Sequence, residues 1–152
     1  MPRASAFTAR PVQAVLGFVA AAVLLSGCLS PSAQSFLDRT NQLRASKGVP
    51  ALANHGTLDA KAQAYAGTLA SRGALVHSNL ADGLSTVRWT TLGENLASGA
   101  QSGDWAARLH EALVKSPAHY NNLVDRRFTH MGVGVASANG SVYVVEVFAQ
   151  IR

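Results

Sequence analysis

The apolar residues in the first half of the chain recur every three or four positions, the spacing that places them on one face of an α-helix. This pattern predicts a helix over residues 33–46, ended by Gly48 and Pro50, and a second helix from an N-cap near Thr57 to Gly73. The residues at helical spacing are Phe36, Leu37, Thr40 and Leu43 in the first helix, and Leu58, Ala62, Tyr65, Ala66 and Leu69 in the second.

The helical periodicity fades between Gly73 and Gly103, where Gly, Ser, Thr and Asn accumulate. This stretch is predicted to form loops with one or two short strands. Asp104 then predicts the N-cap of a third helix. Ser116 followed by Pro117 predicts the start of a fourth, because Ser is favoured at the N-cap and Pro at the first helical position.

The end of the chain has the alternating pattern of β-strands. Residues 131–136 and 142–149 form two such runs, and the dipeptide Asn139-Gly140 lies between them. Asn-Gly in this position predicts a hairpin. Helices followed by a terminal antiparallel hairpin, without internal repeats, predict an α+β fold.

The N-terminus has the features of an export signal. Arg3 and Arg10 precede an apolar run over residues 14–25, which is shorter than the ~20 residues that a membrane-spanning helix needs. Small residues follow the run and lead to Cys28. The string Leu25-Ser26-Gly27-Cys28 resembles a bacterial lipobox, in which Cys28 receives lipid and becomes the first mature residue.

The predicted mature protein is therefore an exported lipoprotein held at a membrane of the cell envelope through Cys28. We expect residues 1–27 to be the signal peptide, residues 28–35 the lipidated cysteine and a short tether, and residues 36–152 one domain. Because Leu29 rather than Asp follows Cys28, we expect the outer membrane in a bacterium with two membranes. The alternative is a membrane anchor that is never removed.

Charge and cysteine content narrow the class of protein further. The formal net charge of +5 includes two arginines of the predicted signal peptide, so the mature chain is only mildly basic. Its basic residues are scattered, only Arg126 and Arg127 are adjacent, and no aromatic platform for stacking bases accompanies them. We therefore expect no nucleic-acid partner. Cys28 is the only cysteine, so burial without a disulfide must hold the domain together.

Two histidines and one acid, His77, Glu94 and His119, are the main candidates for chemistry. With Ser116 as N-cap, His119 occupies the first helical turn, where the helix dipole favours the neutral imidazole that binds a metal or accepts a proton. Glu94 lies among apolar residues, so its carboxylate needs a partner. A structural interpretation stays open for each residue. His77 would be a partly buried, hydrogen-bonded histidine, Glu94 a carboxylate that holds a loop through backbone N–H groups, and His119 an imidazole that closes the helix end by hydrogen bonding.

Other polar residues are less informative. Glu111 and Lys115 stand four residues apart on the predicted third helix, which favours an exposed ion pair. Glu146 interrupts the last strand, and the sequence leaves open whether it faces a cleft or solvent. Ser78 and Ser116 lack the glycine-flanked turn of a nucleophile elbow, which argues against covalent hydrolysis.

Five ordered segments cover almost the whole predicted domain: residues 41–45 with 48–52, residues 58–70 leading to His77-Ser78, residues 93–97, residues 116–119 with 122–124, and residues 132–136 with 143–150. In this order they resemble the CAP superfamily (cysteine-rich secretory proteins, antigen 5 and pathogenesis-related 1 proteins), in its short bacterial SCP-like extracellular form.

The resemblance implies an α-β-α sandwich, with a small antiparallel sheet between helical layers and a surface cleft. In the family this cleft is lined by two histidines and one or two acids, and some members bind a divalent metal there. With water as a fourth ligand, two histidines and one acid suit Zn²⁺. The matching metal ligands here are His77, Glu94 and His119, and Ser78 and Asn95 complete the expected ligand cleft.

The chain departs from the family pattern in two places. Leu113 stands where a tryptophan is common before the Ser-Pro-x-His string, and the second acid of many eukaryotic members has no counterpart, since Glu111 is out of register. The resemblance therefore implies a three-ligand site at most.

Three functions stay open at this point. The first is a membrane-anchored binding module whose cleft takes a lipid, glycan or peptide, with or without a divalent metal. The second is a hydrolase of the cell envelope, peptidase-like, in which a metal activates water or Glu94 and a histidine act as base and acid. The third is a structural interaction domain. We rank the binding module first and leave enzyme activity open, because a fold does not fix a function.

Overall fold

The computed structural model describes residues 29–152, so the predicted signal peptide over residues 1–27 and the predicted lipidation site Cys28 lie outside the described residues. The elements in chain order are α1 (Pro31–Ser46), β1 (Ala53–Asn54), α2 (Gly56–Arg72), β2 (Trp89–Ala100), α3 (Trp105–Lys115), α4 (Pro117–Val124), β3 (His130–Ala138) and β4 (Ser141–Ile151). Within residues 29–152, every helix is too short or too polar to cross a membrane.

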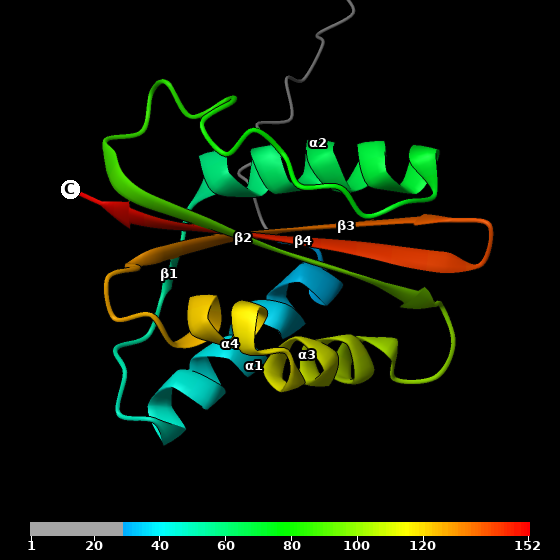
Figure 1. Ribbon diagram of the computed structural model, residues 1–152, viewed down its shortest axis with the longest axis horizontal. Helices are drawn as coiled ribbons and strands as arrows, with labels where there is room; N and C mark the ends of the chain where they lie inside the picture. Colours follow the sequence, from blue (N-terminus) through cyan, green and yellow to red (C-terminus); the bar gives the residue numbers. More distant parts are fainter. Residues whose placement is uncertain (1–28) are drawn as a thin grey trace, which may run out of the picture.

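A four-stranded sheet forms the middle layer of the molecule. Its strand order is β1-β3-β4-β2; β2 and β3 pair with β4 in antiparallel fashion, whereas the two-residue β1 pairs with β3 in parallel. Helix α2 covers one face, and α1, α3 and α4 cover the other (Figure 1). The predicted α+β fold and α-β-α layering are confirmed, with the correction that β1 makes the sheet mixed.

The first two helices start at different residues from those predicted. Helix α1 begins at Pro31, capped by the Ser30 hydroxyl, so residues 31–35 belong to the helix and not to a tether. Helix α2 begins after His55, not at Thr57, because pairing with β3 keeps the chain extended up to His55. As predicted, α2 ends at Gly73, which adopts the left-handed conformation with φ of 65°.

The stretch between α2 and α3 contains one long strand, β2, in place of one or two short ones. The alternating pattern is missing because residues 93–97 are buried on both faces of the sheet: Leu96 packs in the cluster of α2 on one side, and α3 and α4 cover the other. β2 is also an edge strand, so only one of its sides pairs with the sheet.

The remaining predicted elements are confirmed. The Asp104 carboxylate caps α3 by accepting a hydrogen bond from the Ala107 amide at 3.0 Å. Ser116 has the extended conformation of an N-cap before α4, although its side chain makes no capping bond. Asn139 and Gly140 have φ values of 50° and 74°, the positive pair that a tight hairpin between β3 and β4 requires.

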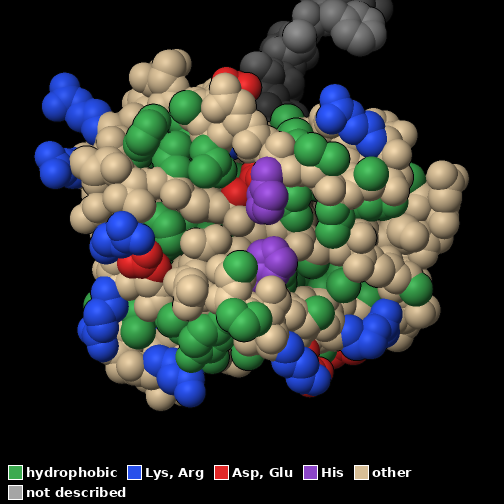
Figure 2. Space-filling view, in the orientation of Figure 1, with side chains coloured by type: hydrophobic (Ala, Val, Ile, Leu, Met, Phe, Trp, Pro, Cys, Tyr) green, Lys and Arg blue, Asp and Glu red, His purple; other side chains and the backbone are tan. Residues whose placement is uncertain are grey.

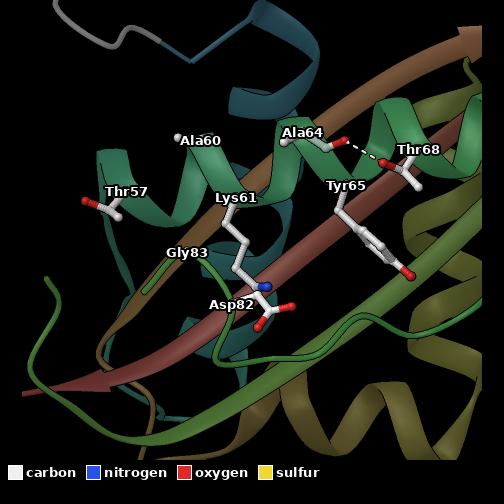
Figure 3. Close-up of a pocket in the computed structure, with 8 residues that line it drawn as sticks. All are labelled: Thr57, Ala60, Lys61, Ala64, Tyr65, Thr68, Asp82 and Gly83. Carbon is white, nitrogen blue, oxygen red and sulfur yellow. Dashed lines mark hydrogen bonds between the residues drawn. The ribbon is translucent and has the colours of Figure 1, made fainter. Parts of the chain in front are cut away.

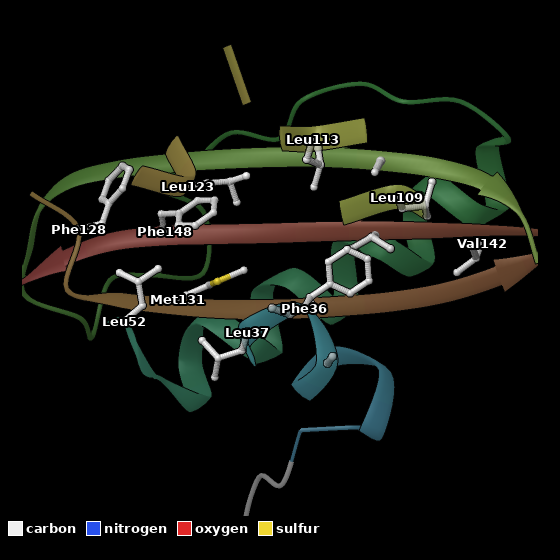
Figure 4. Packing of buried hydrophobic residues seen from close by; sticks show 14 residues of the cluster. Phe36, Leu37, Leu52, Leu109, Leu113, Leu123, Phe128, Met131, Val142 and Phe148 are labelled. Carbon is white, nitrogen blue, oxygen red and sulfur yellow. The ribbon is translucent and has the colours of Figure 1, made fainter. Parts of the chain in front are cut away.

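The two faces of the sheet carry separate clusters of buried apolar residues. The larger cluster packs between the sheet and α1, α3 and α4, where the rings of Phe128 and Phe148 stack with centroids 5.4 Å apart (Figure 4). The smaller cluster joins α2 to the odd-numbered residues 143–149 of β4. Alternation along each strand therefore decides which layer of helices a side chain meets.

Helix α2 lies against β3 at two glycines. A Cβ atom at Gly132 would meet the backbone of Leu58 and Asp59, and one at Gly134 would meet the backbone of Ala62 and Gln63. These contacts involve main-chain atoms, which cannot rotate away. The close approach seats α2 on the sheet and so fixes the start of the loop that follows it.

We expect Gly134→Ala to lower the free energy of unfolding by about 3 kcal/mol, the upper end of the usual cost of overpacking, because α2 must move away from β3. Gly67→Ala is the matched control, since Gly67 lies in α2 and an added Cβ there meets nothing within 4 Å. That control should gain up to ~1 kcal/mol from helix propensity. Equilibrium urea unfolding measures both, and equal stability of Gly134→Ala and the wild type would contradict the packing of α2.

Candidate functional site

The loop after α2 is joined to β2 by the carboxylate of Glu94. Oε1 accepts hydrogen bonds from His77 Nδ1 at 2.8 Å and from the Ser78 amide at 3.0 Å, and Oε2 accepts from the Ser78 hydroxyl at 2.6 Å. The Glu94 side chain is 1% exposed, whereas that of His77 is 64% exposed. The carboxylate is thus a buried support, and the imidazole it holds faces solvent.

This arrangement determines which nitrogen of His77 is available. An ionised carboxylate only accepts hydrogen bonds, so Nδ1 must carry the hydrogen that it donates to Glu94. In the neutral ring, Nε2 then has the free lone pair. A carboxylate behind a histidine is the usual means of fixing the tautomer and orientation of a ligand imidazole.

The same loop is fastened to α2 by two side chains one helical turn apart. The Tyr65 hydroxyl donates to the Val76 carbonyl at 2.6 Å, and Lys61 Nζ donates to the Asn79 carbonyl at 2.9 Å. Sequence reasoning assigned Tyr65 to an apolar stripe and did not find Lys61. The only available signal was their spacing of four residues, which predicts a shared helix face but not a partner.

His119 lies in the first turn of α4, as predicted. Burial lowers the pKa of His119, and the nearby His77 imidazole lowers it further. The ring is therefore neutral at pH 7. Figure 2 shows two histidine side chains close together on the face of the molecule that β2 and α4 turn toward the viewer.

Asn95 supports α4 from inside the molecule. Its side chain is fully buried, and its Nδ2 donates to the His119 carbonyl at 3.2 Å. Asn122 Nδ2 donates to Asn95 Oδ1 at 2.9 Å and to the Glu94 carbonyl at 3.3 Å. Asn95 was predicted to line the cleft, and the structure places it beneath the surface, where it joins α4 to β2.

We use the name cleft for the site formed by His77, Ser78, Glu94 and His119, with Asn95 beneath it. A separate pocket of about 410 Å³ lies between α2 and residues 82–83 (Figure 3). Lys61 and Tyr65, which fasten the loop, also line this pocket. The side chains that hold the His77 loop therefore also form part of this pocket's wall.

The structure clarifies two further acids. Glu111 is exposed and forms an ion pair with Lys115, as its spacing predicted, and plays no part in the cleft. Glu146, whose direction the sequence left open, faces neither solvent nor the surface of the cleft and is fully buried.

The sequence predicted His77, Glu94 and His119 as metal ligands, and the structure shows which of their atoms have a free lone pair. Within residues 29–152, no group of three or more His, Cys, Asp or Glu side chains is arranged to hold a metal ion. Both oxygens of Glu94 already accept hydrogen bonds from His77 and Ser78. The groups with a lone pair to offer are Nε2 of His77 and the ring of His119, and Glu94 supports His77 alone.

Comparison with known proteins places the domain in a family. The model of the family described as CAP, the cysteine-rich secretory protein family, matches residues 37–150. None of the curated proteins matches the chain at a significant level.

Several solved structures share the fold. An outer surface protein from Borrelia burgdorferi is 19% identical, with a TM-score of 0.70 over 78% of this chain and 92% of that one. An extracellular protein from Bacillus anthracis that contains an SCP domain is 26% identical, with a TM-score of 0.63 over 82% of this chain and 45% of that one. NaASP2, in a crystal structure with Zn²⁺, is 18% identical, with a TM-score of 0.62 over 82% of this chain and 83% of that one.

We expect Glu94→Ala to lower the free energy of unfolding by about 1–3 kcal/mol, because the Ser78 amide and hydroxyl lose their acceptor in a partly buried place. Hydrogen exchange should quicken at residues 76–79 and stay unchanged in β4. Glu111→Ala, which removes an exposed acid, is the control and should leave both measurements unchanged. Unaltered exchange in the loop of Glu94→Ala would show that Glu94 does not hold it.

Proposed function

The chain belongs to the CAP family of cysteine-rich secretory proteins, and from this premise we propose that it is an exported binding module whose ligand cleft centres on His77, Glu94 and His119. One observation carries the proposal. The buried Glu94 carboxylate holds an exposed imidazole in a fixed orientation next to a second, neutral imidazole. Fixing a solvent-exposed side chain costs conformational entropy during folding. Because that cost is then not repeated on binding, a fixed imidazole favours contact with a ligand.

The first ligand that the cleft suits is a divalent metal of the zinc type, which accepts neutral imidazole nitrogens. His77 through Nε2 and His119 would hold it, and Glu94 would orient His77 from behind. A bound metal supplies a Lewis acid that attracts an oxygen of a further ligand. NaASP2, which shares the fold, has been crystallised with Zn²⁺.

The second part of the proposal concerns location. We propose that residues 1–27 direct export and that lipid on Cys28 anchors the protein at the cell envelope. Only Leu29 and Ser30 separate Cys28 from α1, so the anchor would hold the domain directly against the membrane surface. A lipid, glycan or peptide of the envelope is therefore the class of organic ligand that the cleft would meet.

A hydrolase is the second candidate, and the Glu94–His77 pair favours it. A carboxylate that orients a histidine is the usual arrangement of a general base, which draws a proton from water or from a substrate. If this activity exists, Glu94→Gln should abolish turnover in a protein that stays folded. A structural interaction domain is the third possibility, and it requires that cleft variants change stability alone.

We expect the full chain in detergent to bind one Zn²⁺ per molecule at pH 7 in titration calorimetry. His77→Ala and His119→Ala should each weaken binding strongly, and the double variant should abolish it. Glu94→Gln should weaken binding by roughly 10–100-fold, the usual effect of losing an orienting partner.

Controls come from two histidines on the side of the sheet formed by β1 and β3, away from β2. His55 and His130 lie against each other with ring centroids 5.7 Å apart, and His55→Ala and His130→Ala should leave zinc affinity unchanged. A folded wild type that binds no zinc would remove the metal from the proposal and leave the cleft as a site for an organic ligand alone.

A further inference from the structure

A buried acid lies beneath α4. Glu146 on β4 alternates with Val142, Val144 and Phe148, which belong to the larger apolar cluster, so its side chain points into the layer that contains α1, α3 and α4. It is 0% exposed. Neither the apolar packing nor the surface of the cleft accounts for a carboxyl group in this place.

The Glu146 carboxyl group has a single hydrogen-bond partner. Its Oε2 accepts from Asn95 Nδ2 at 3.0 Å, and no donor in the described part of the chain reaches Oε1. Burial raises the pKa of Glu146 to about 8, and the bond from Asn95 only partly opposes this. The group is therefore a neutral carboxylic acid at pH 7.

The titratable groups of the surrounding helices do not supply a counter-charge. Arg44 on α1 donates to four backbone carbonyls, those of Pro50, Leu123, Asp125 and Phe128. His110 on α3 contacts the Thr40 hydroxyl, and burial followed by the charge of Arg39 lowers the pKa of His110 to about 4. His119 on α4 meets this network only through its backbone carbonyl.

Asn95 connects the buried acid to the cleft. Its Nδ2 donates to both Glu146 Oε2 and the His119 carbonyl, and its Oδ1 accepts from Asn122. The His119 carbonyl can only accept and Asn122 Nδ2 can only donate, so these two neighbours set the orientation of the Asn95 amide. In that orientation Glu146 Oε2 is the second acceptor of Asn95 Nδ2, and this bond ties the buried acid to the group that holds the first turn of α4.

We infer that Glu146 is a positioning residue for His119: Glu146 holds Asn95 in place, and Asn95 in turn holds the first turn of α4. The inference rests on the proposed function of the cleft, because it assigns Glu146 the task of setting the distance and direction of one of the two imidazoles. It also makes the cleft sensitive to pH, through a titrating group that lies beneath α4.

The direction of the pH effect follows from the raised pKa. Between the ordinary pKa of a glutamate, 4.5, and the folded value of about 8, the native state binds a proton that the unfolded state lacks. Stability therefore falls as pH rises through this range. Above about pH 8 the carboxylate is a buried charge without a partner cation, and a shift of Asn95 or α4 that admits water relieves it.

The experiment compares the wild type with Glu146→Gln, which stays neutral and keeps an acceptor oxygen, and Glu146→Met, which fills the space without an acceptor. The full chain in detergent is labelled with ¹⁵N in its histidine rings, and the ring signals are followed by NMR from pH 7 to pH 9. His119→Gln assigns the His119 signal. His130, on β3 and separated from β2 by β4, is the internal reference.

The His119 signal of the wild type should move between pH 7 and pH 9, and that of Glu146→Gln should stay constant. Glu146→Met should show a displaced His119 signal already at pH 7, an unchanged His130 signal and roughly tenfold weaker zinc binding, the lower end of the cost of losing a supporting group. An unchanged His119 signal in Glu146→Met, or equal pH profiles of the wild type and Glu146→Gln, would overturn the inference. Failure of the wild type to bind zinc contradicts the metal site alone, and the NMR comparison still decides the role of Glu146.

Discussion

The alternation of side chains along β2 is the constraint on which the cleft depends. Consecutive residues of a strand point to opposite faces, so Glu94 points to the side of α2 and Asn95 to the side of α1, α3 and α4. Glu94 holds the loop with His77, and Asn95 holds the helix with His119. The two imidazoles therefore come from opposite layers of the sandwich and meet around a free edge of the sheet, and a shift of one residue in the register of β2 would exchange their supports.

This construction explains why so many polar groups are buried near the cleft. A loop and a short helix have little apolar surface with which to hold a fixed position, so hydrogen bonds in places of low dielectric do this work. Lys61 and Tyr65 on α2 hold the loop, and Asn122 in α4 donates to the Glu94 carbonyl and so joins α4 to β2. The apolar clusters fix the sheet and the long helices, and the polar contacts fix the parts that carry the histidines.

The sequence predicted the elements whose signal is local, but it did not predict the strand β2, which is buried on both faces. Helical spacing, the glycine at the end of α2 and the Asn-Gly turn all act within a few residues, so they could be recognised without a structure. The strand β2 could not, because helices cover both of its faces and alternation is lost. His77, Glu94 and His119 were found because their strings resemble a family. The roles of Lys61, Asn122 and Glu146 depend on contacts between residues 18 or more positions apart, for which a single sequence carries no signal.

The two halves of the cleft differ in how completely their supports are hydrogen-bonded. Glu94 accepts from three donors, and the loop it holds has two further fastenings on α2. Beneath α4, Glu146 has one bond and an oxygen without a donor in the described residues. A complete network resists movement, whereas an incomplete one leaves an alternative arrangement close in free energy. If Glu146 positions His119 as inferred, His77 is the fixed member of the pair and His119 is the member whose position responds to the buried acid. In a binding module this asymmetry lets one histidine define the site while the other adjusts to what occupies it.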